Sequence, residues 1–264
     1  MSLFFSCVVV AVDLMDPKND PDVQTHIKRG YFELKDGDGQ PASQITEDVV
    51  LRMRDDFLAY AEPRLSGQTR DLTVSVSWDN PYYTAHARYT DKELYIGLWG
   101  GFLRAPGMNT SILSFTMCHE LGHLIGGEPR QTNDSGENIT AEGPSDFFAA
   151  FKCVADFLER HPQYRPQISL QVRQLCQQSK ACELSLEAGL QTFQFLQKWG
   201  FAPYEPVSLT KKAPSVEEFA PNAYPIYQCR VDTVVAGAIC LRDQRNTCSP
   251  PPCWWPQGRP YPQN

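Results

Sequence analysis

The 264-residue sequence predicts an α+β fold in which a small mixed sheet precedes a series of helices. Residues 72–101 alternate in polarity and are rich in β-branched and aromatic side chains, which is typical of strands. Asn109-Thr110-Ser111 offers N-cap candidates for a helix whose apolar run begins at Ile112 and is closed by Gly126-Gly127. Residues 142–161 carry apolar side chains at helical spacing. Residues 169–199 predict two further helices. A chain of this length is long enough for one well-buried domain.

Three stretches within the predicted sheet are expected to form successive strands. Leu72–Trp78 alternates in polarity, and the turn residues Asp79-Asn80-Pro81 separate it from Tyr82–Tyr89. In the third stretch, Glu93–Gly101, every second side chain from Leu94 to Leu98 is apolar. The stretch then ends at two glycines, Gly100 and Gly101.

The first twenty residues differ from the rest of the chain. Residues 3–12 are apolar like the centre of an export signal, but no Lys or Arg precedes them. We therefore expect residues 1–20 to be the remnant of an export or lipoprotein signal that begins upstream of Met1. Cys7 would then be a lipid anchor or be lost with the signal, and a first core strand is the alternative. Residues 21–264 would form a single domain with a Cys- and Pro-rich tail from about residue 243.

The most informative motif is His119-Glu120-Leu121-Gly122-His123, in the last turns of the predicted helix that Gly126-Gly127 close. On a helix, positions i and i+4 lie on the same face, so both imidazoles can reach one metal ion. Glu120 lies beside them and can accept a proton from a water molecule at that ion. Two His and a Glu on a buried helix are costly without partners, and a metal ion supplies the partner. The alternative is that each His is a hydrogen-bonded core residue.

A catalytic zinc normally has three protein ligands, and known schemes place the third one differently. In the metzincin scheme a third His and a downstream Met-turn are needed. Here Pro129 stands where that His should be, and all five Met precede the motif. In the gluzincin scheme a Glu on a second helix is the third ligand, and an Asp follows four residues later. Glu142 and Asp146 occupy these positions.

This pattern resembles the thermolysin-like and CAAX-processing gluzincins, which implies a zincin-like fold and one zinc ion per chain. By this resemblance His119, His123 and Glu142 bind zinc, and Asp146 accepts a hydrogen bond from a ligand His. Ala141 departs from the Asn that thermolysin-like enzymes usually have before the Glu. An aspzincin-like arrangement with Asp146 as the ligand remains the alternative.

The chain is also similar to a group of bacterial envelope proteins with a zincin motif followed by a Cys-Arg-x-Asp-Thr segment, here residues 229–233. This similarity covers roughly residues 70–160 and 224–242 and implies no particular substrate. Zincins bind an extended substrate on an edge strand above the metal, through backbone hydrogen bonds. We expect Glu93–Gly101 to be that strand, although an ordinary sheet strand with a glycine turn is the alternative. The predicted substrate-binding residues are Tyr95, Gly97, Gly100 and Gly101.

Composition and cysteines restrict partners and compartment. The net charge of -7 and the absence of a basic run argue against nucleic acid and anionic membrane surfaces. No apolar stretch is long enough to span a membrane. Nine cysteines predict an oxidising, extracytoplasmic compartment. Their spacing suggests the disulfides Cys176–Cys182, Cys229–Cys240 and Cys248–Cys253, while Cys118 and Cys153 either pair or remain buried thiols.

The sequence thus predicts a zinc-dependent peptidase that hydrolyses protein or peptide substrates outside the cytoplasm. Glu120 would act as the general base. The developing oxyanion needs a further hydrogen-bond donor, and among Arg230, Tyr227 and His161 we choose Arg230. The alternative from another class is a catalytically silent, zinc-stabilised binding protein of the envelope. The intact Glu120 argues against this alternative, because a binding module does not need a base there.

Overall fold

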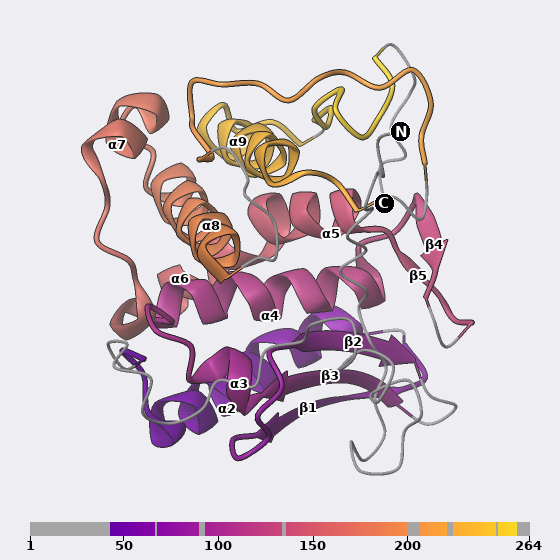
Figure 1. The fold of residues 1–264 in the computed structure, drawn as a ribbon, viewed down its shortest axis with the longest axis vertical. Helices are drawn as coiled ribbons and strands as arrows, with labels where there is room; N and C mark the ends of the chain where they lie inside the picture. Colours follow the sequence, from indigo (N-terminus) through magenta and orange to yellow (C-terminus); the bar gives the residue numbers. More distant parts are fainter. Residues whose placement is uncertain are drawn as a thin grey trace, which may run out of the picture.

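The computed structural model describes residues 43–66, 68–89, 93–133, 136–199, 206–220, 224–246 and 248–257. The predicted signal remnant at residues 1–20, with Cys7, lies outside these ranges. Within them the chain has the predicted α+β composition, with small sheets and a larger set of helices. Helix α4 (Thr110–Ile125) crosses the centre of the molecule (Figure 1). The three-stranded sheet lies on one side of it, and α5 (Glu142–Phe148), α8 (Lys180–Trp199) and α9 (Tyr227–Arg242) lie on the other.

The sheet is mixed, as the sequence predicts. Strands β1 (Asp71–Ser77), β2 (Ala85–Tyr89) and β3 (Glu93–Trp99) lie in the order β1-β3-β2. Strand β3 pairs in parallel with β1 and antiparallel with β2. The prediction that residues 93–101 form an edge strand is therefore wrong, because both sides of β3 are occupied. In the described part of the chain, β2 forms one edge of this sheet.

The glycines of this region serve close packing within the chain. A Cβ atom on Gly97 would lie 2.2 Å from the ring of His86. The chain turns after Trp99 into helix α3 (Gly100–Leu103), where a Cβ on Gly100 would lie 1.7 Å from the carbonyl oxygen of Trp78. Gly101 has a similarly close backbone neighbour. Larger residues would push these segments apart, so the glycines are required by the fold rather than by a substrate.

Helix α4 begins and ends as its sequence predicts. The side chain of Asn109 accepts hydrogen bonds from the backbone N–H groups of Ser111 and Ile112, which satisfies donors that the first helical turn leaves free. Gly126 caps the other end. Almost every residue of α4 is buried, because the sheet, α5 (Glu142–Phe148) and α8 (Lys180–Trp199) surround it.

The second predicted helix, residues 142–161, is continuous but changes its winding. Helix α5 passes into a π-helical turn, η2 (Ala149–Cys153), and then into α6 (Val154–Arg160). Pro144 fits in the first turn because no helical partner exists there for a backbone N–H. The remaining elements are α2 (Glu47–Ala61), η1 (Glu62–Leu65), β4 (Arg130–Thr132), β5 (Asn138–Thr140), η3 (Pro162–Tyr164), α7 (Leu170–Cys176) and α9 (Tyr227–Arg242).

Four disulfides join the described cysteines. Cys176–Cys182 is as predicted, and Cys118 pairs with Cys153. The other two predicted pairings are wrong, because the bonds are Cys229–Cys253 and Cys240–Cys248. Cys229 and Cys240 lie on the same helix, α9, where their Cα atoms are separated by roughly 16 Å along the helix axis. A disulfide needs Cα atoms within about 7 Å, so these two cysteines cannot pair.

The described part of the tail packs on the domain. Cys253 is bonded to α9 through Cys229, and Trp254 donates a hydrogen bond from Nε1 to the hydroxyl of Thr233. The Trp254 ring also covers the start of α5, where a Cβ atom on Gly143 would lie 2.4 Å from it. Residues 248–257 thus hold α5 and α9 together. Among the described helices, none is both long and apolar enough to cross a membrane.

Candidate metal centre

Helix α4 presents its two histidines toward α5, and Glu120 is buried beside them. His119, Glu120 and His123 are 7%, 5% and 1% exposed. Gly122 allows this approach, because a Cβ atom there would lie 2.9 Å from the backbone of Ser145. A glycine inside a helix costs roughly 0.5–1 kcal/mol relative to alanine, and here it permits close contact between the two helices.

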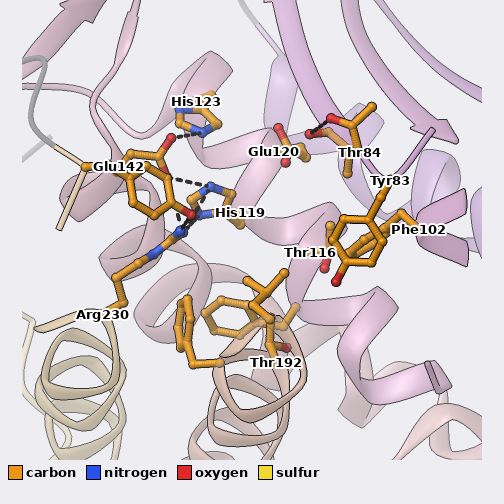
Figure 2. A pocket seen from close by; sticks show the side chains of 15 residues that line it. Tyr83, Thr84, Phe102, Thr116, His119, Glu120, His123, Glu142, Thr192 and Arg230 are labelled. Carbon is orange, nitrogen blue, oxygen red and sulfur yellow. Dashed lines mark hydrogen bonds and ion pairs between the residues drawn. The ribbon is translucent and has the colours of Figure 1, made fainter. Parts of the chain in front are cut away.

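The first residue of α5 completes a three-residue cluster. Glu142 Oε2 lies 3.3 Å from Nε2 of His119, and Glu142 Oε1 lies 3.5 Å from Nε2 of His123. One ligand atom from each of these three residues lies within 4.8 Å of the other two. The group could therefore hold one metal ion, and Figure 2 shows the three side chains pointing toward one another.

Each imidazole is oriented by its other ring nitrogen. Nδ1 of His119 lies 2.8 Å from Oδ1 of Asp146, and Nδ1 of His123 lies 2.7 Å from the carbonyl oxygen of Thr140. The hydroxyl of Ser145 is 3.1 Å from the same nitrogen of His123. A hydrogen bond at Nδ1 turns the lone pair of Nε2 toward the centre, which is how ligand histidines are commonly fixed.

Arg230 of α9 lies behind this cluster and binds its carboxylates. Its Nε and Nη2 atoms donate to Asp146 at 2.7 and 2.8 Å, and Nη2 is 3.2 Å from Glu142 Oε2. Nη1 donates to the hydroxyl of Tyr224. The guanidinium, 3% exposed, packs over the rings of Phe193 and Tyr224 at 4.7 Å each. Arg230 thus neutralises and positions two buried carboxylates.

The buried charges determine one another's protonation. Burial alone would lower the pKa of His119, but Asp146 and Glu142 raise it to about 10. Burial lowers the pKa of His123 to about 4, although Glu142 opposes this change. Burial favours the neutral form of Glu142, but His123, Arg230 and His119 hold its pKa well below the usual range. At neutral pH His119 is therefore protonated, His123 is neutral and Glu142 is ionised.

Glu120 differs from the other acids of the centre. Its Oε2 atom is buried and has no hydrogen-bond partner among the described residues. Burial raises the pKa of this carboxyl to about 7, although His119 opposes the shift. Buried carboxylate oxygens are normally hydrogen-bonded, so an unpartnered one at this position requires an explanation.

The centre opens into a pocket with a volume of about 110 Å³. His119, Glu120, His123, Glu142 and Arg230 line one part of it, as Figure 2 shows. The other lining residues are mostly apolar or aromatic: Tyr83, Thr84, Ala85, Phe102, Phe115, Thr116, Thr192, Phe193, Leu196 and Tyr224. The pocket is therefore polar at the cluster and largely apolar beyond it.

The structure brings the residues of the motif together with Glu142, Asp146 and Arg230. The predicted substrate-binding residues are not part of this group. Tyr95, Gly97, Gly100 and Gly101 do not line the pocket. The segment that does so is Tyr83–Ala85, at the start of the edge strand β2. The sequence could not indicate this segment, because the order of strands in a sheet depends on pairing between distant residues.

Two oxyanion-donor candidates from the sequence lie elsewhere. His161 is 3.4 Å from Asp56, and neither His161 nor Tyr227 lines the pocket. Tyr224, which the sequence did not indicate, does line it and accepts a hydrogen bond from Arg230. Tyr224 lies three residues before α9, so a prediction of α9 could have drawn attention to it. The sequence did not predict α9.

The comparisons with known proteins gave no match. No protein-family model matches this chain. No curated protein and no solved structure is similar enough to count as a relative or a neighbour. The chain is an α+β protein in which His119, His123 and Glu142 could hold a metal ion.

Proposed function

We propose that the protein is a zinc-dependent peptidase of the gluzincin type, with a zincin-like fold, that hydrolyses peptide bonds in a protein or peptide substrate. The observation that carries this proposal is the carboxylate of Glu120, which is buried beside the His-His-Glu cluster with one oxygen unpartnered. A carboxylate with a purely structural role would be hydrogen-bonded. A carboxylate that accepts a proton from an incoming water molecule has its partner only during the reaction.

The donor set favours zinc as the metal. Two imidazole nitrogens and one carboxylate oxygen are a common ligand set for catalytic zinc, which keeps a fourth position open. The ligand atoms of the three residues already lie close enough together to bind one such ion. Both histidines could bind it through Nε2 and keep their present partners at Nδ1. Zinc bound there would act as a Lewis acid that polarises the scissile carbonyl and lowers the pKa of water.

The chain's own residues then have separate tasks. Glu120 accepts a proton from the attacking water and passes it to the leaving amine. The segment Tyr83–Ala85, which lines the pocket at the start of β2, would offer backbone groups to an extended substrate, in place of the predicted Glu93–Gly101. Arg230 positions Asp146 and Glu142, and its engaged donors make it a poor partner for an oxyanion.

The experiment that tests this function combines metal analysis with a digest of casein and of a peptide library by the pure protein. We expect one zinc per chain and cleavage that stops when a chelator removes the metal and resumes when zinc is restored. Zinc bound at one per chain without any cleavage would contradict the peptidase proposal. That result would instead support a zinc-stabilised binding protein.

Tyr224 replaces Arg230 as the proposed donor to the oxyanion. Its hydroxyl oxygen accepts from Arg230, so its own proton is available toward the pocket. We expect Tyr224→Phe to lower kcat by about 10²-fold, with little change in KM or zinc content, because the bond forms mainly in the transition state. Tyr95→Phe, at a residue that does not line the pocket, is the matched control and should leave kcat unchanged. Equal rates for both variants would exclude this role.

Zinc uptake should displace one proton from His119. With a pKa of about 10 this imidazole is protonated at pH 6, whereas His123, with a pKa of about 4, is already neutral. A ligand imidazole must be neutral, so zinc affinity should rise about tenfold per pH unit up to about pH 10. The cleanest measurement is calorimetry of Glu120→Gln at pH 6 in buffers of different ionisation enthalpy, with about one proton released. Release of none would show that His119 is neutral before zinc binds.

We also propose an extracytoplasmic location. The described cysteines form four disulfides, which persist in oxidising compartments and are rare in a reducing cytosol. We expect thiol labelling of the protein taken from cells to modify the eight cysteines from Cys118 onward only after reduction. Labelling of all eight without a reductant would place the protein in the cytoplasm and leave the zinc chemistry unaffected.

A further inference from the structure

The apolar part of the pocket is lined by a tyrosine, Tyr83, whose hydroxyl the catalytic steps above do not use. The hydroxyl oxygen of Tyr83 is buried and has no hydrogen-bond partner among the described residues. Tyr83 lines the same pocket as the metal cluster. In the view of Figure 2, Tyr83, Phe102 and Thr116 lie at the opposite side of the pocket from His119 and Glu142, with Glu120 between them.

The ring of Tyr83 is held firmly, so its hydroxyl has a fixed position. The ring packs edge-on against Phe102 at a centroid distance of 5.3 Å and stacks with Phe195 at 6.1 Å. Burial, and then the nearby phenol of Tyr227, raise the pKa of Tyr83 well above its usual value, so the hydroxyl remains neutral. It can both donate and accept a hydrogen bond.

The surrounding walls determine which ligand group can reach this hydroxyl. Phe102, Phe115, Phe193 and Leu196 supply apolar and aromatic surface that suits a ring. Among the described lining residues the cations are Arg230 and the protonated His119, and both are already paired with Asp146 and Glu142. Apart from Glu120, the charged lining residues lie at the metal cluster, on the opposite side from Tyr83 in the view of Figure 2. The pocket therefore suits an aromatic ring with a neutral polar group at its end.

We propose that this pocket binds a tyrosine side chain of the substrate next to the scissile bond, with the hydroxyl of Tyr83 as the partner of the substrate phenol. This inference rests on the proposed peptidase function and names the residue that the site selects. A phenylalanine would fill the same space but would leave the Tyr83 hydroxyl unpartnered. A site with a buried polar group discriminates against ligands that cannot pair with it.

The direct test compares binding of tyrosine hydroxamate and phenylalanine hydroxamate, two zinc-directed probes, to the zinc-loaded protein. We expect the tyrosine probe to bind about tenfold more tightly or better, which is the size of one hydrogen bond to a buried group. Tyr83→Phe should reduce the difference to less than about threefold. Tyr82→Phe, the same change at a neighbour that does not line the pocket, should preserve it.

Two further measurements separate this inference from the proposed function. In a peptide-library digest the wild type should favour tyrosine over phenylalanine at one position beside the cleaved bond, and Tyr83→Phe should lose this preference. The melting temperature of Tyr83→Phe should be equal to or above that of the wild type, because an unpartnered hydroxyl is removed. A clearly lower melting temperature would mean that the hydroxyl already has a partner and would overturn the inference.

The remaining outcomes are also decisive. Equal affinity for both hydroxamates, with peptides still cleaved, would overturn the tyrosine subsite and leave the peptidase function intact. Zinc-loaded protein that binds neither hydroxamate and cleaves no peptide would remove the proposed function, and the subsite would fall with it.

Discussion

Replacing Glu120 by Gln should lower kcat for peptide hydrolysis by about 10²–10⁴-fold, which is the usual contribution of a positioned general base. Glutamine has nearly the same shape but cannot accept the proton of the attacking water. Because Oε2 of Glu120 has no partner among the described residues, the substitution breaks no hydrogen bond at that atom. The variant should therefore fold normally and keep one zinc per chain.

The control for this experiment is Glu128→Gln, which removes a carboxylate that is 57% exposed just beyond the same helix. It should retain wild-type kcat, so a loss seen with Glu120→Gln alone reflects chemistry rather than net charge. Elemental analysis and thermal unfolding should be measured for both variants. Full turnover by zinc-loaded Glu120→Gln would refute the mechanism.

The second large effect concerns the third ligand. Glu142→Gln should lose its zinc on dialysis, because an amide replaces the carboxylate whose oxygens lie near both Nε2 atoms. Asp146→Asn should weaken zinc binding by only about 10–100-fold, as is usual for a group that orients a ligand His. Asp146 sits at Nδ1 of His119, on the far side of the ring from Glu142.

These isosteric changes are preferable to alanine. Removal of the Asp146 carboxylate by truncation would leave Arg230 buried without its two strongest contacts, at a cost of about 3–5 kcal/mol. A competition titration with a chromophoric chelator gives both affinities. If Asp146→Asn lost zinc while Glu142→Gln kept it, the ligand would be Asp146, and the aspzincin-like arrangement would be correct.

The sequence predicted best what depends on neighbours along one helix. His119, Glu120 and His123 are brought together by a single turn of α4, and the same local rule located the helix that starts at Glu142. Its cap at Asn109 was also visible in the sequence. These features need only the helical period, so the structure places them where they were expected.

The sequence did not predict two kinds of feature: those that depend on pairing between residues far apart in the chain, and helices that are buried on all sides. Strand β3 lies between β1 and β2, which local alternation cannot reveal. Helix α9 is buried on nearly all sides and lacks a polar face, so no helical period marked it. Because α9 was missed, Cys229 and Cys240 were paired incorrectly, and the partners of Arg230 were not foreseen. Tyr83 and Tyr224 reach the pocket from segments far apart in the chain.

The Cys118–Cys153 disulfide has a topological consequence for the metal centre. The bond closes a ring of the chain, and His119, His123, Glu142 and Asp146 all lie inside it. In an open unfolded chain, the 23 steps from His119 to Glu142 could extend to roughly 80 Å. In the oxidised chain the shorter path through the disulfide limits this separation to roughly 45 Å. The whole ligand set therefore belongs to one covalent macrocycle, which keeps its members within reach of one another even where the surrounding helices have come apart.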